Sequence, residues 1–235
     1  MSGDQLTAAH VCYEIGALRI LDDVGVSVGA GEMVAVSGPS GSGKTTLLSI
    51  LGGLLQPTRG TVSFGGEPVW RGNGDPRGDV SFVLQVYGLV PILTARENVE
   101  VALRARGVAP READQAAEAA LARLQVADLG DRQVDELSGG QMQRVAGARA
   151  LAPGAALLLA DEPTSELDEV SRDVVLHELR REASRGATVI VATHDSAVVD
   201  VCDREYHLVD GAVVVDVGAG DHRAGGGLHR ADETA

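Results

Sequence analysis

The chain has little of several residue types that mark particular protein classes. Only one of its 20 basic residues is a lysine, aromatic residues make up 3% of the 235 positions, and there are two cysteines. Two cysteines are too few for a disulfide framework or a metal-binding knuckle, so we expect reduced thiols in a cytosolic protein. Because aromatic rings are so rare, the core has to be built from alanine, valine and leucine.

Positive charge and long hydrophobic runs are scarce as well. The formal net charge is −14, which disfavours nucleic acid and anionic membranes as partners, since both require a basic face. The longest apolar runs, such as residues 157–160, are far shorter than the roughly 20 residues of a membrane span. The first ten residues lack both the basic and the apolar segment of a secretory signal. We therefore expect a cytoplasmic protein that binds no nucleic acid.

Short apolar runs suited to strands alternate with helical patterns along the chain. The strand-like runs lie at 33–37, 61–64, 80–84, 156–160, 188–192, 205–209 and 212–215. Several of them are nearly all apolar, as expected for strands covered on both faces. Helical patterns follow Gly43, cover 95–106 and 111–125, begin at Ser138 and cover 169–184. This alternation predicts an α/β fold with a largely parallel sheet. The helices between 86 and 150 follow one another without a strand and indicate an inserted helical subdomain.

The single lysine, Lys44, lies in the segment GPSGSGKT at 38–45, between an apolar run and a helical pattern. Such a strand–loop–helix setting is the one that the phosphate-binding motif requires. The glycines let backbone N–H groups wrap an anion, and the helix presents its positive N-terminus to the same phosphates. A compact ammonium fits this cradle better than the larger guanidinium of arginine. The segment predicts a nucleotide-phosphate site made of Ser37, Gly38, Pro39, Ser40, Gly41, Ser42, Gly43, Lys44, Thr45 and Thr46.

Two carboxylates follow the apolar run at 156–160. Asp161 and Glu162 would stand at the carboxyl end of a strand, where open α/β sheets bind ligands. With the hydroxyl of Thr45, Asp161 suits a Mg²⁺ site, and Glu162 suits a polariser of the attacking water. Alone, this pair is also compatible with an ordinary solvated strand end.

The stretch LSGGQMQRV at 137–145 resembles the signature of the ATP-binding cassette (ABC) ATPases. Ser138 is a good N-cap and two glycines allow close backbone approach, so the helix start is a second anion-binding terminus. In the family, two chains pair head to tail, and each ATP lies between the phosphate loop of one chain and the signature of the other. The resemblance implies that Ser138, Gly139, Gly140 and Gln141 bind the partner's nucleotide.

The same resemblance assigns roles to residues that would otherwise be read as structural. Gln85, after the strand-like VSFVLQ, matches the glutamine that senses Mg²⁺ and water, and His194 matches the histidine that contacts the γ-phosphate. Tyr13 matches the aromatic position that stacks on adenine. The segment SELD at 165–168 matches the family's D-loop.

The resemblance covers residues 6–216 and implies a fold and a division of the chain. We expect a P-loop NTPase (RecA-like) core with a mostly parallel sheet, an N-terminal antiparallel β part and the inserted helical subdomain. The ABC ATPase domain would span 1–217, with the core at 1–84 and 154–217 and the helical subdomain at 86–150. The tail at 218–235 is expected to be disordered.

The implied function is the ATP-binding and ATP-hydrolysing subunit of an ABC transporter. It would use ATP and Mg²⁺, form a homodimer or a paired cassette, and power a separate membrane permease from the inner face of the cell membrane. Residues 85–95 would form the docking surface. Several segments look closest to the branch of lipoprotein-release, macrolide-export and cell-division ATPases, which favours an exporter. An ATPase of a mechanotransmission complex and a soluble ABC protein are the alternatives.

Glu166 and the loop at 71–79 depart from that branch. Glu166 stands where the branch commonly has asparagine, and the loop is shorter than usual. A carboxylate at 166 would lie near the partner's phosphates, where like charges cost free energy. We therefore expect slower turnover or a weaker nucleotide dimer than in a relative that lacks this charge.

Overall fold

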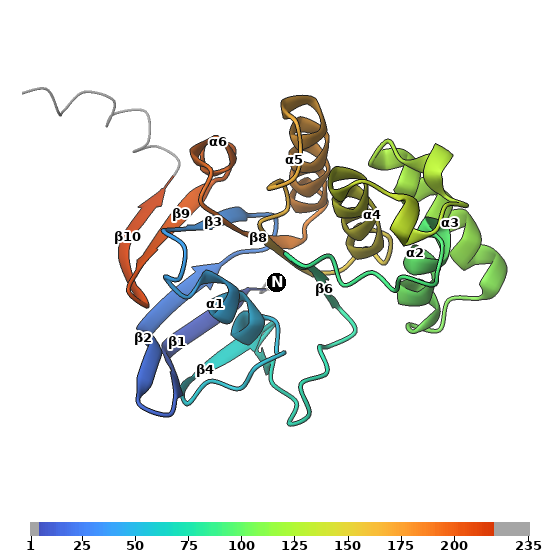
Figure 1. The fold of residues 1–235 in the computed structure, drawn as a ribbon. Coiled ribbons are helices and arrows are strands. Elements are labelled where there is room, and N and C mark those ends of the chain that lie inside the picture. Colours follow the sequence, from blue (N-terminus) through green and yellow to red (C-terminus); the bar gives the residue numbers. More distant parts are fainter. Residues whose placement is uncertain (1–4, 219–235) are drawn as a thin grey trace, which may run out of the picture.

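The computed structural model describes residues 5–218, and two β-sheets organise them (Figure 1). The larger sheet has the order β10-β9-β3-β8-β7-β6, in which β9, β3, β8, β7 and β6 are parallel and β10 is antiparallel at one edge. Its strands are β3 (Met33–Ser37), β6 (Val80–Val83), β7 (Leu157–Asp161), β8 (Thr188–Thr193), β9 (Arg204–Val209) and β10 (Ala212–Gly218). This sheet confirms the predicted α/β fold. The predicted disorder of 218–235 falls, after Gly218, outside the described residues.

The smaller sheet is antiparallel and contains the N-terminal strands, as predicted. Its order is β2-β1-β4-β5, with β1 (Leu6–Ile15), β2 (Leu18–Val28), β4 (Arg59–Phe64) and β5 (Glu67–Pro68). Buried and exposed residues alternate along much of β1 and β2, the pattern of strands with one solvated face. The register between β1 and β2 is broken at several places, and this interrupts the alternation. The alternating pattern that would predict the two strands is therefore weak in the sequence.

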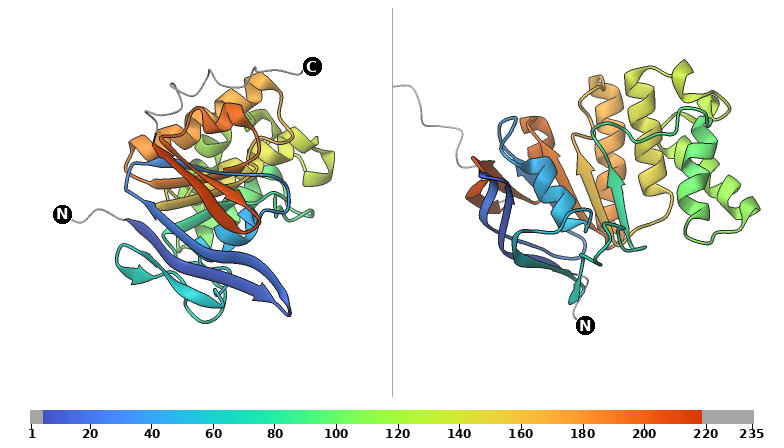
Figure 2. Two further views of the ribbon diagram at one scale, coloured as in Figure 1. Left: turned by 90° about the vertical axis from the view of Figure 1, so that its left-hand side faces the viewer. Right: turned by 60° about the horizontal axis from the view of Figure 1, so that its bottom comes forward.

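Helix α1 (Lys44–Leu51) lies between the two sheets, and the other helices lie on the opposite face of the larger sheet (Figures 1 and 2). These are α2 (Ala95–Arg104), α3 (Pro110–Arg123), α4 (Gly139–Leu151), α5 (Glu169–Ser184), the short α6 (Ser196–Val199), and the 3₁₀ turns η1 (Ala127–Leu129) and η2 (Val134–Glu136). None of the helices in the described part of the chain is long and apolar enough to cross a membrane.

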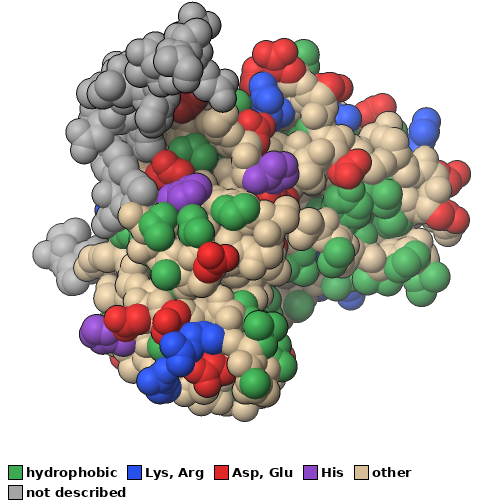
Figure 3. Space-filling view, turned by 60° about the vertical axis from the view of Figure 1, so that its left-hand side comes forward, with side chains coloured by type: hydrophobic (Ala, Val, Ile, Leu, Met, Phe, Trp, Pro, Cys, Tyr) green, Lys and Arg blue, Asp and Glu red, His purple; other side chains and the backbone are tan. Residues whose placement is uncertain are grey.

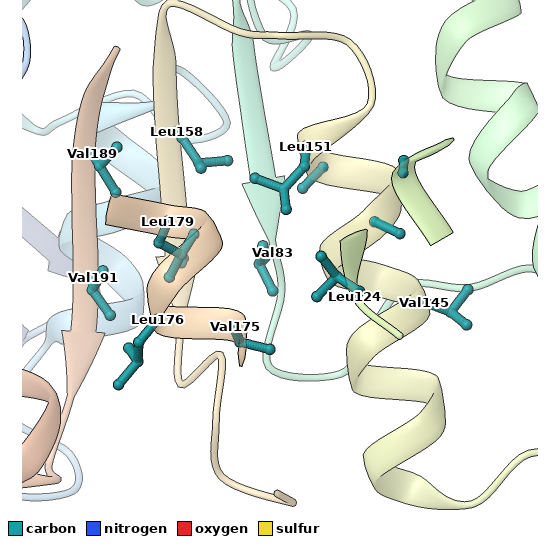
Figure 4. Close-up of a cluster of buried hydrophobic side chains, with 14 of the residues drawn as sticks. Val83, Leu124, Val145, Leu151, Leu158, Val175, Leu176, Leu179, Val189 and Val191 are labelled. Carbon is teal, nitrogen blue, oxygen red and sulfur yellow. The ribbon is translucent and has the colours of Figure 1, made fainter. Parts of the chain in front are cut away.

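Two hydrophobic cores lie on the two faces of the larger sheet. Strand β3 is fully buried and shares its side chains between them, with Val34 facing α1 and Ala35 facing α5. The core on the α5 side continues into the helical part of the chain (Figure 4). The side chains that Figure 4 labels are Val83, Leu124, Val145, Leu151, Leu158, Val175, Leu176, Leu179, Val189 and Val191. As the composition predicts, these residues are aliphatic.

The helices α2, α3 and α4 pack together, and polar contacts attach them to the sheet part. Helix α2 begins with a capping box in which Thr94 accepts from the Glu97 amide and the Glu97 carboxylate accepts from the Thr94 amide. The guanidinium of Arg106, just after α2, donates to the carbonyl of Val80 at 2.6 Å. Arg123 at the end of α3 pairs with Glu178 of α5 at 2.6 Å. Loss of either partner would leave the other charge buried and unpaired, so this contact ties α3 to α5.

Candidate functional site

The loop 38–43 connects β3 to α1 and is shaped by glycine. A Cβ atom on Gly38 would lie 2.1 Å from the carbonyl oxygen of Leu208, and on Gly43 it would lie 2.8 Å from a methyl of Leu21. Both glycines also have positive φ angles, 139° and 104°, which other residues rarely adopt. Both positions therefore require glycine. The loop curves around the N-terminus of α1, as the motif predicts.

Lys44 is buried at the first position of α1. Its ammonium donates to the carbonyl oxygens of Gly38 at 2.8 Å and Pro39 at 3.0 Å. These carbonyls hold a positive charge over the loop at the N-terminus of α1. A phosphate group is the kind of anion that this arrangement attracts.

Asp161, at the carboxyl end of β7, and Thr45, in the first turn of α1, are in direct contact, an arrangement that suits the predicted magnesium site. The Thr45 hydroxyl donates to Oδ2 of Asp161 at 2.7 Å, and the other carboxylate oxygen, Oδ1, is buried without a hydrogen-bond partner. Burial raises the pKa of Asp161 above its ordinary value, more than the Thr45 hydrogen bond lowers it. A cation beside Oδ1 would compensate this carboxylate, so the residues fit Mg²⁺.

The donor set is small, which is usual for magnesium. In the described part of the chain no cluster of three or more His, Cys, Asp or Glu side chains could hold a metal by itself. Mg²⁺ commonly takes only one or two protein oxygens and completes its shell with phosphates and water. Thr45 and Asp161 are such a pair.

Glu162 is held in place by three contacts, two from the end of β8 and one from α4. Its carboxylate Oε1 lies 2.8 Å from Nδ1 of His194, its amide donates to the Ala192 carbonyl at 2.9 Å, and its carbonyl accepts from the side chain of Gln143 at 2.7 Å. Its φ angle is +47°, a strained conformation that concentrates at functional sites. The catalytic candidates Glu162 and His194 are thus brought together.

One pocket of about 260 Å³ joins most of the predicted phosphate and metal residues. Its lining consists of Ile20, Ser40, Gly41, Gly43, Lys44, Thr45, Thr46, Gln85, Asp161 and Glu162. Gln85, which follows β6 and is exposed, therefore faces the same space as the two carboxylates. Ser37, Gly38, Pro39 and His194 line a neighbouring pocket of about 380 Å³.

The signature residues start α4 as predicted, away from the phosphate pocket. The Ser138 hydroxyl accepts from the Gln141 amide at 3.3 Å, and Oε1 of Gln141 accepts from the Ser138 amide at 2.9 Å. The phosphate pocket is lined by none of the residues 138–141. Within one chain the two anion-binding helix starts are therefore separate.

Tyr13 lies on β1 opposite Leu21 and is half-buried against the core beneath α1. It does not line the phosphate pocket, whereas Ile20 of β2 does. The adenine contact of Tyr13 remains a prediction.

Sequence reasoning missed the role of Gln143. This side chain is buried in α4; besides its bond to Glu162, it donates to the Ser165 hydroxyl at 3.3 Å and accepts from the Glu166 amide at 2.9 Å. It links the signature helix to Glu162 and to the D-loop at once. The position of this glutamine, two residues after LSGGQ, does not predict these contacts, because only the fold brings residues 162–166 close to it.

Glu166 lies against the signature of its own chain. A Cβ on Gly139 would be 3.4 Å from Oε2 of Glu166 and 3.6 Å from the hydroxyl of Tyr87. Burial, and secondarily the charge of Glu166, raise the pKa of Tyr87. A negative charge thus stands at the start of α4, the place where the resemblance puts the partner's phosphate.

The comparisons with known proteins agree with this geometry. A family model described as "ABC transporter" matches residues 21–165. An uncharacterized ABC transporter ATP-binding protein of Mycobacterium tuberculosis is 44% identical over 82% of this chain and 60% of the relative. The macrolide export ATP-binding/permease protein MacB of Marinobacter nauticus is 42% identical over 86% of this chain and 32% of its own length. The chain therefore spans about 60% of the length of the first relative and about a third of the length of the second.

Among solved structures, the fold is similar to the dimeric cassette MJ0796 bound to ADP and Pi. The TM-score is 0.83 and the identity 33%, over 91% of this chain and 98% of that one. The residues matched by the family model include the phosphate loop and the two carboxylates. The chain therefore belongs to the ABC transporter family and has the structure of an ATP-binding cassette.

Proposed function

We propose that the chain binds ATP with Mg²⁺ and hydrolyses it in a head-to-tail homodimer or paired cassette that drives a separate membrane permease. The single observation that carries the proposal is the pocket in which Lys44, Asp161 and Glu162 converge while the signature helix begins elsewhere. One chain thus supplies the phosphate loop of one ATP site and the signature of a second ATP site. The dimeric MJ0796 cassette supports the pairing.

In this proposal different residues of the pocket bind the phosphates and the magnesium ion. Lys44 and the loop amides bind the β- and γ-phosphates, and Thr45 and Asp161, with Gln85, hold Mg²⁺. When bound, Mg²⁺ neutralises charge that develops on the transferred phosphoryl group.

Glu162 accepts a proton from the attacking water as general base, and His194 holds its carboxylate in orientation. Ser138 and the amides of 139–141 stabilise the γ-phosphate of the partner's nucleotide from the other side.

A complementation experiment tests the pairing. Lys44→Ala destroys the phosphate loop of one chain, and Ser138→Arg destroys the signature of another, so each variant alone should be inactive. A mixture of the two contains dimers in which one intact loop faces one intact signature, and it should regain a substantial part of the activity. A mixture that stays inactive, although both variants are folded, would contradict the head-to-tail site.

The proposed permease contact rests on exposed apolar residues between β6 and α2. Val86 and Ile92, two large apolar side chains in this short segment, are 81% and 80% exposed. Figure 3 shows hydrophobic side chains gathered toward the helical part of the chain. The likeness to a macrolide export protein supports an exporter as the partner, and the proposal puts the cassette at the cytoplasmic face of the membrane beside its permease. Ile92→Ser should abolish stimulation of the ATPase by the reconstituted permease and leave the basal rate unchanged.

A further inference from the structure

Three polar side chains meet behind the start of the phosphate loop: Ser37, the first residue of the predicted phosphate segment, and two side chains of β9 to which the proposed mechanism gives no role. Ser37 ends β3, and Glu205 and His207 lie two residues apart on the neighbouring parallel strand β9, so both point to the same side of the sheet. The Ser37 oxygen lies 2.6 Å from Nδ1 of His207 and donates to Oε1 of Glu205. Nδ1 of His207 and Oε1 of Glu205 are 3.6 Å apart.

The chemistry of these groups sets a direction for the hydrogen bonds. A hydroxyl has one hydrogen, and an ionised carboxylate can only accept, so Ser37 donates to Glu205. The Ser37 oxygen then accepts from His207, which requires the imidazole hydrogen on Nδ1. The tautomer is assigned from this network. The result is a relay from His207 through Ser37 to Glu205.

The relay holds the residue that precedes the curved part of the loop. Ser37 is followed by Gly38, whose carbonyl accepts from Lys44 at 2.8 Å and whose Cα faces the Leu208 carbonyl with no room for a Cβ. Strand β9 therefore fixes the loop start twice, by a polar relay at Ser37 and by backbone contact at Gly38.

A hollow borders the relay on the side away from the core. A pocket of about 380 Å³ lies there, with Ser37, Gly38 and Pro39 on one wall and His194 on another. Exposure rises toward this pocket, from 5% at Ser37 through 15% at the Glu205 side chain to 37% at the His207 side chain. On the side of this hollow few atoms are available for van der Waals contact, so the hydrogen bonds of the relay add to the hold that Leu208 gives from the other side.

We propose that His207 is a positioning residue for nucleotide binding, which acts through Ser37 on the Gly38 carbonyl and hence on Lys44. This inference rests on the proposed ATP-binding role of the loop. The loop contacts the phosphates in the ground state and in the transition state alike. Loss of the relay should therefore raise KM for ATP and leave kcat little changed.

The experiment compares steady-state ATP hydrolysis and thermal unfolding of full-length variants. His207→Leu should raise KM about fivefold, the effect of one net hydrogen bond, with kcat within about twofold of the wild type. In His207→Asn, the side-chain amide can donate from nearly the same place as Nδ1, so KM should return most of the way to the wild-type value. The matched control is His177→Leu, on the exposed face of α5, which should change neither constant.

Ser37→Ala removes the middle of the relay without adding bulk and carries the test if His207→Leu does not fold. It should raise KM as much as His207→Leu does, and the double variant should add little, because both substitutions break one chain of contacts. An unchanged KM in both folded variants would overturn the proposal. So would a lowered Tm with unchanged KM, or failure of His207→Asn to recover. An inactive wild type would instead contradict the proposed function itself, and this inference with it.

Discussion

The imidazole of His194 and the carboxylate of Glu162 follow the ends of two adjacent parallel strands, β8 and β7, and lie 2.8 Å apart. The contact joins Nδ1 to Oε1, so with Glu162 ionised the imidazole donates and its other nitrogen is left for a further partner. The carboxylate also lines the phosphate pocket, and in the proposed mechanism the bond from His194 orients it to take a proton from water.

His194→Ala should therefore slow hydrolysis and spare nucleotide binding. The carboxylate of Glu162 would lose its orienting donor, and loss of an aligned general base costs on the order of 10²-fold or more in kcat. The measurement is single-turnover hydrolysis together with the Kd of a fluorescent ATP analogue. His177→Ala is the matched control, and a normal kcat in His194→Ala would remove the histidine from the mechanism.

Asp161→Asn should stabilise the nucleotide-free protein at pH 7 and abolish its response to Mg²⁺–ATP. Burial raises the pKa of Asp161, so the folded state binds its proton more tightly than the unfolded chain does. The stability that Asp161 contributes is therefore full below its ordinary pKa, and it is lost as the pH rises from that value through the raised pKa of the folded state. The uncharged asparagine avoids the loss, and its advantage in Tm should shrink at acid pH. Equal gains in Tm from Mg²⁺–ATP in both proteins would contradict the magnesium role.

Glu166→Asn should speed ATP turnover and strengthen the ATP-dependent dimer. The Glu166 carboxylate lies against Gly139 at the start of α4, where its charge opposes an incoming phosphate. The effect should be larger at low ionic strength, since salt screens exposed charges. Glu169→Gln, an exposed carboxylate in the first turn of α5, is the control for loss of net charge. Unchanged turnover and dimerisation would disprove the expectation.

Gln143→Leu should lower both stability and turnover. The substitution keeps the volume but leaves the Glu162 carbonyl and the Glu166 amide without their partner, which costs about 1–3 kcal/mol for a buried group. Urea denaturation and kcat are the two measurements. The control is Gln115→Leu on the exposed side of α3. A stability loss with normal kcat would reduce Gln143 to a purely structural residue.

The sequence was informative where a local motif sets local structure. The phosphate loop, the carboxylates after β7 and the capped start of α4 depend on glycine conformation, strand ends and N-capping, and the structure has each of them where the motif predicts. The runs that predict β3 and β8 are fully buried in the structure, because strands covered on both faces must be apolar throughout.

Contacts between distant segments could not be predicted in the same way. Gln143, Glu166 with Gly139, and the relay of Ser37 with His207 all depend on how separate elements pack, and sequence spacing says nothing of this. The irregular pairing of β1 with β2 and the single turn of α6 also give only weak periodic patterns.

The most direct test of the account is the mass of Glu162→Gln in light scattering after size exclusion, with and without Mg²⁺–ATP. The variant should bind nucleotide without hydrolysing it, so the two half-sites should stay closed around ATP. We predict a shift from monomer to twice the monomer mass that requires ATP, and that disappears when Ser138→Arg is added. A protein that binds ATP yet stays monomeric at every concentration would contradict the shared site.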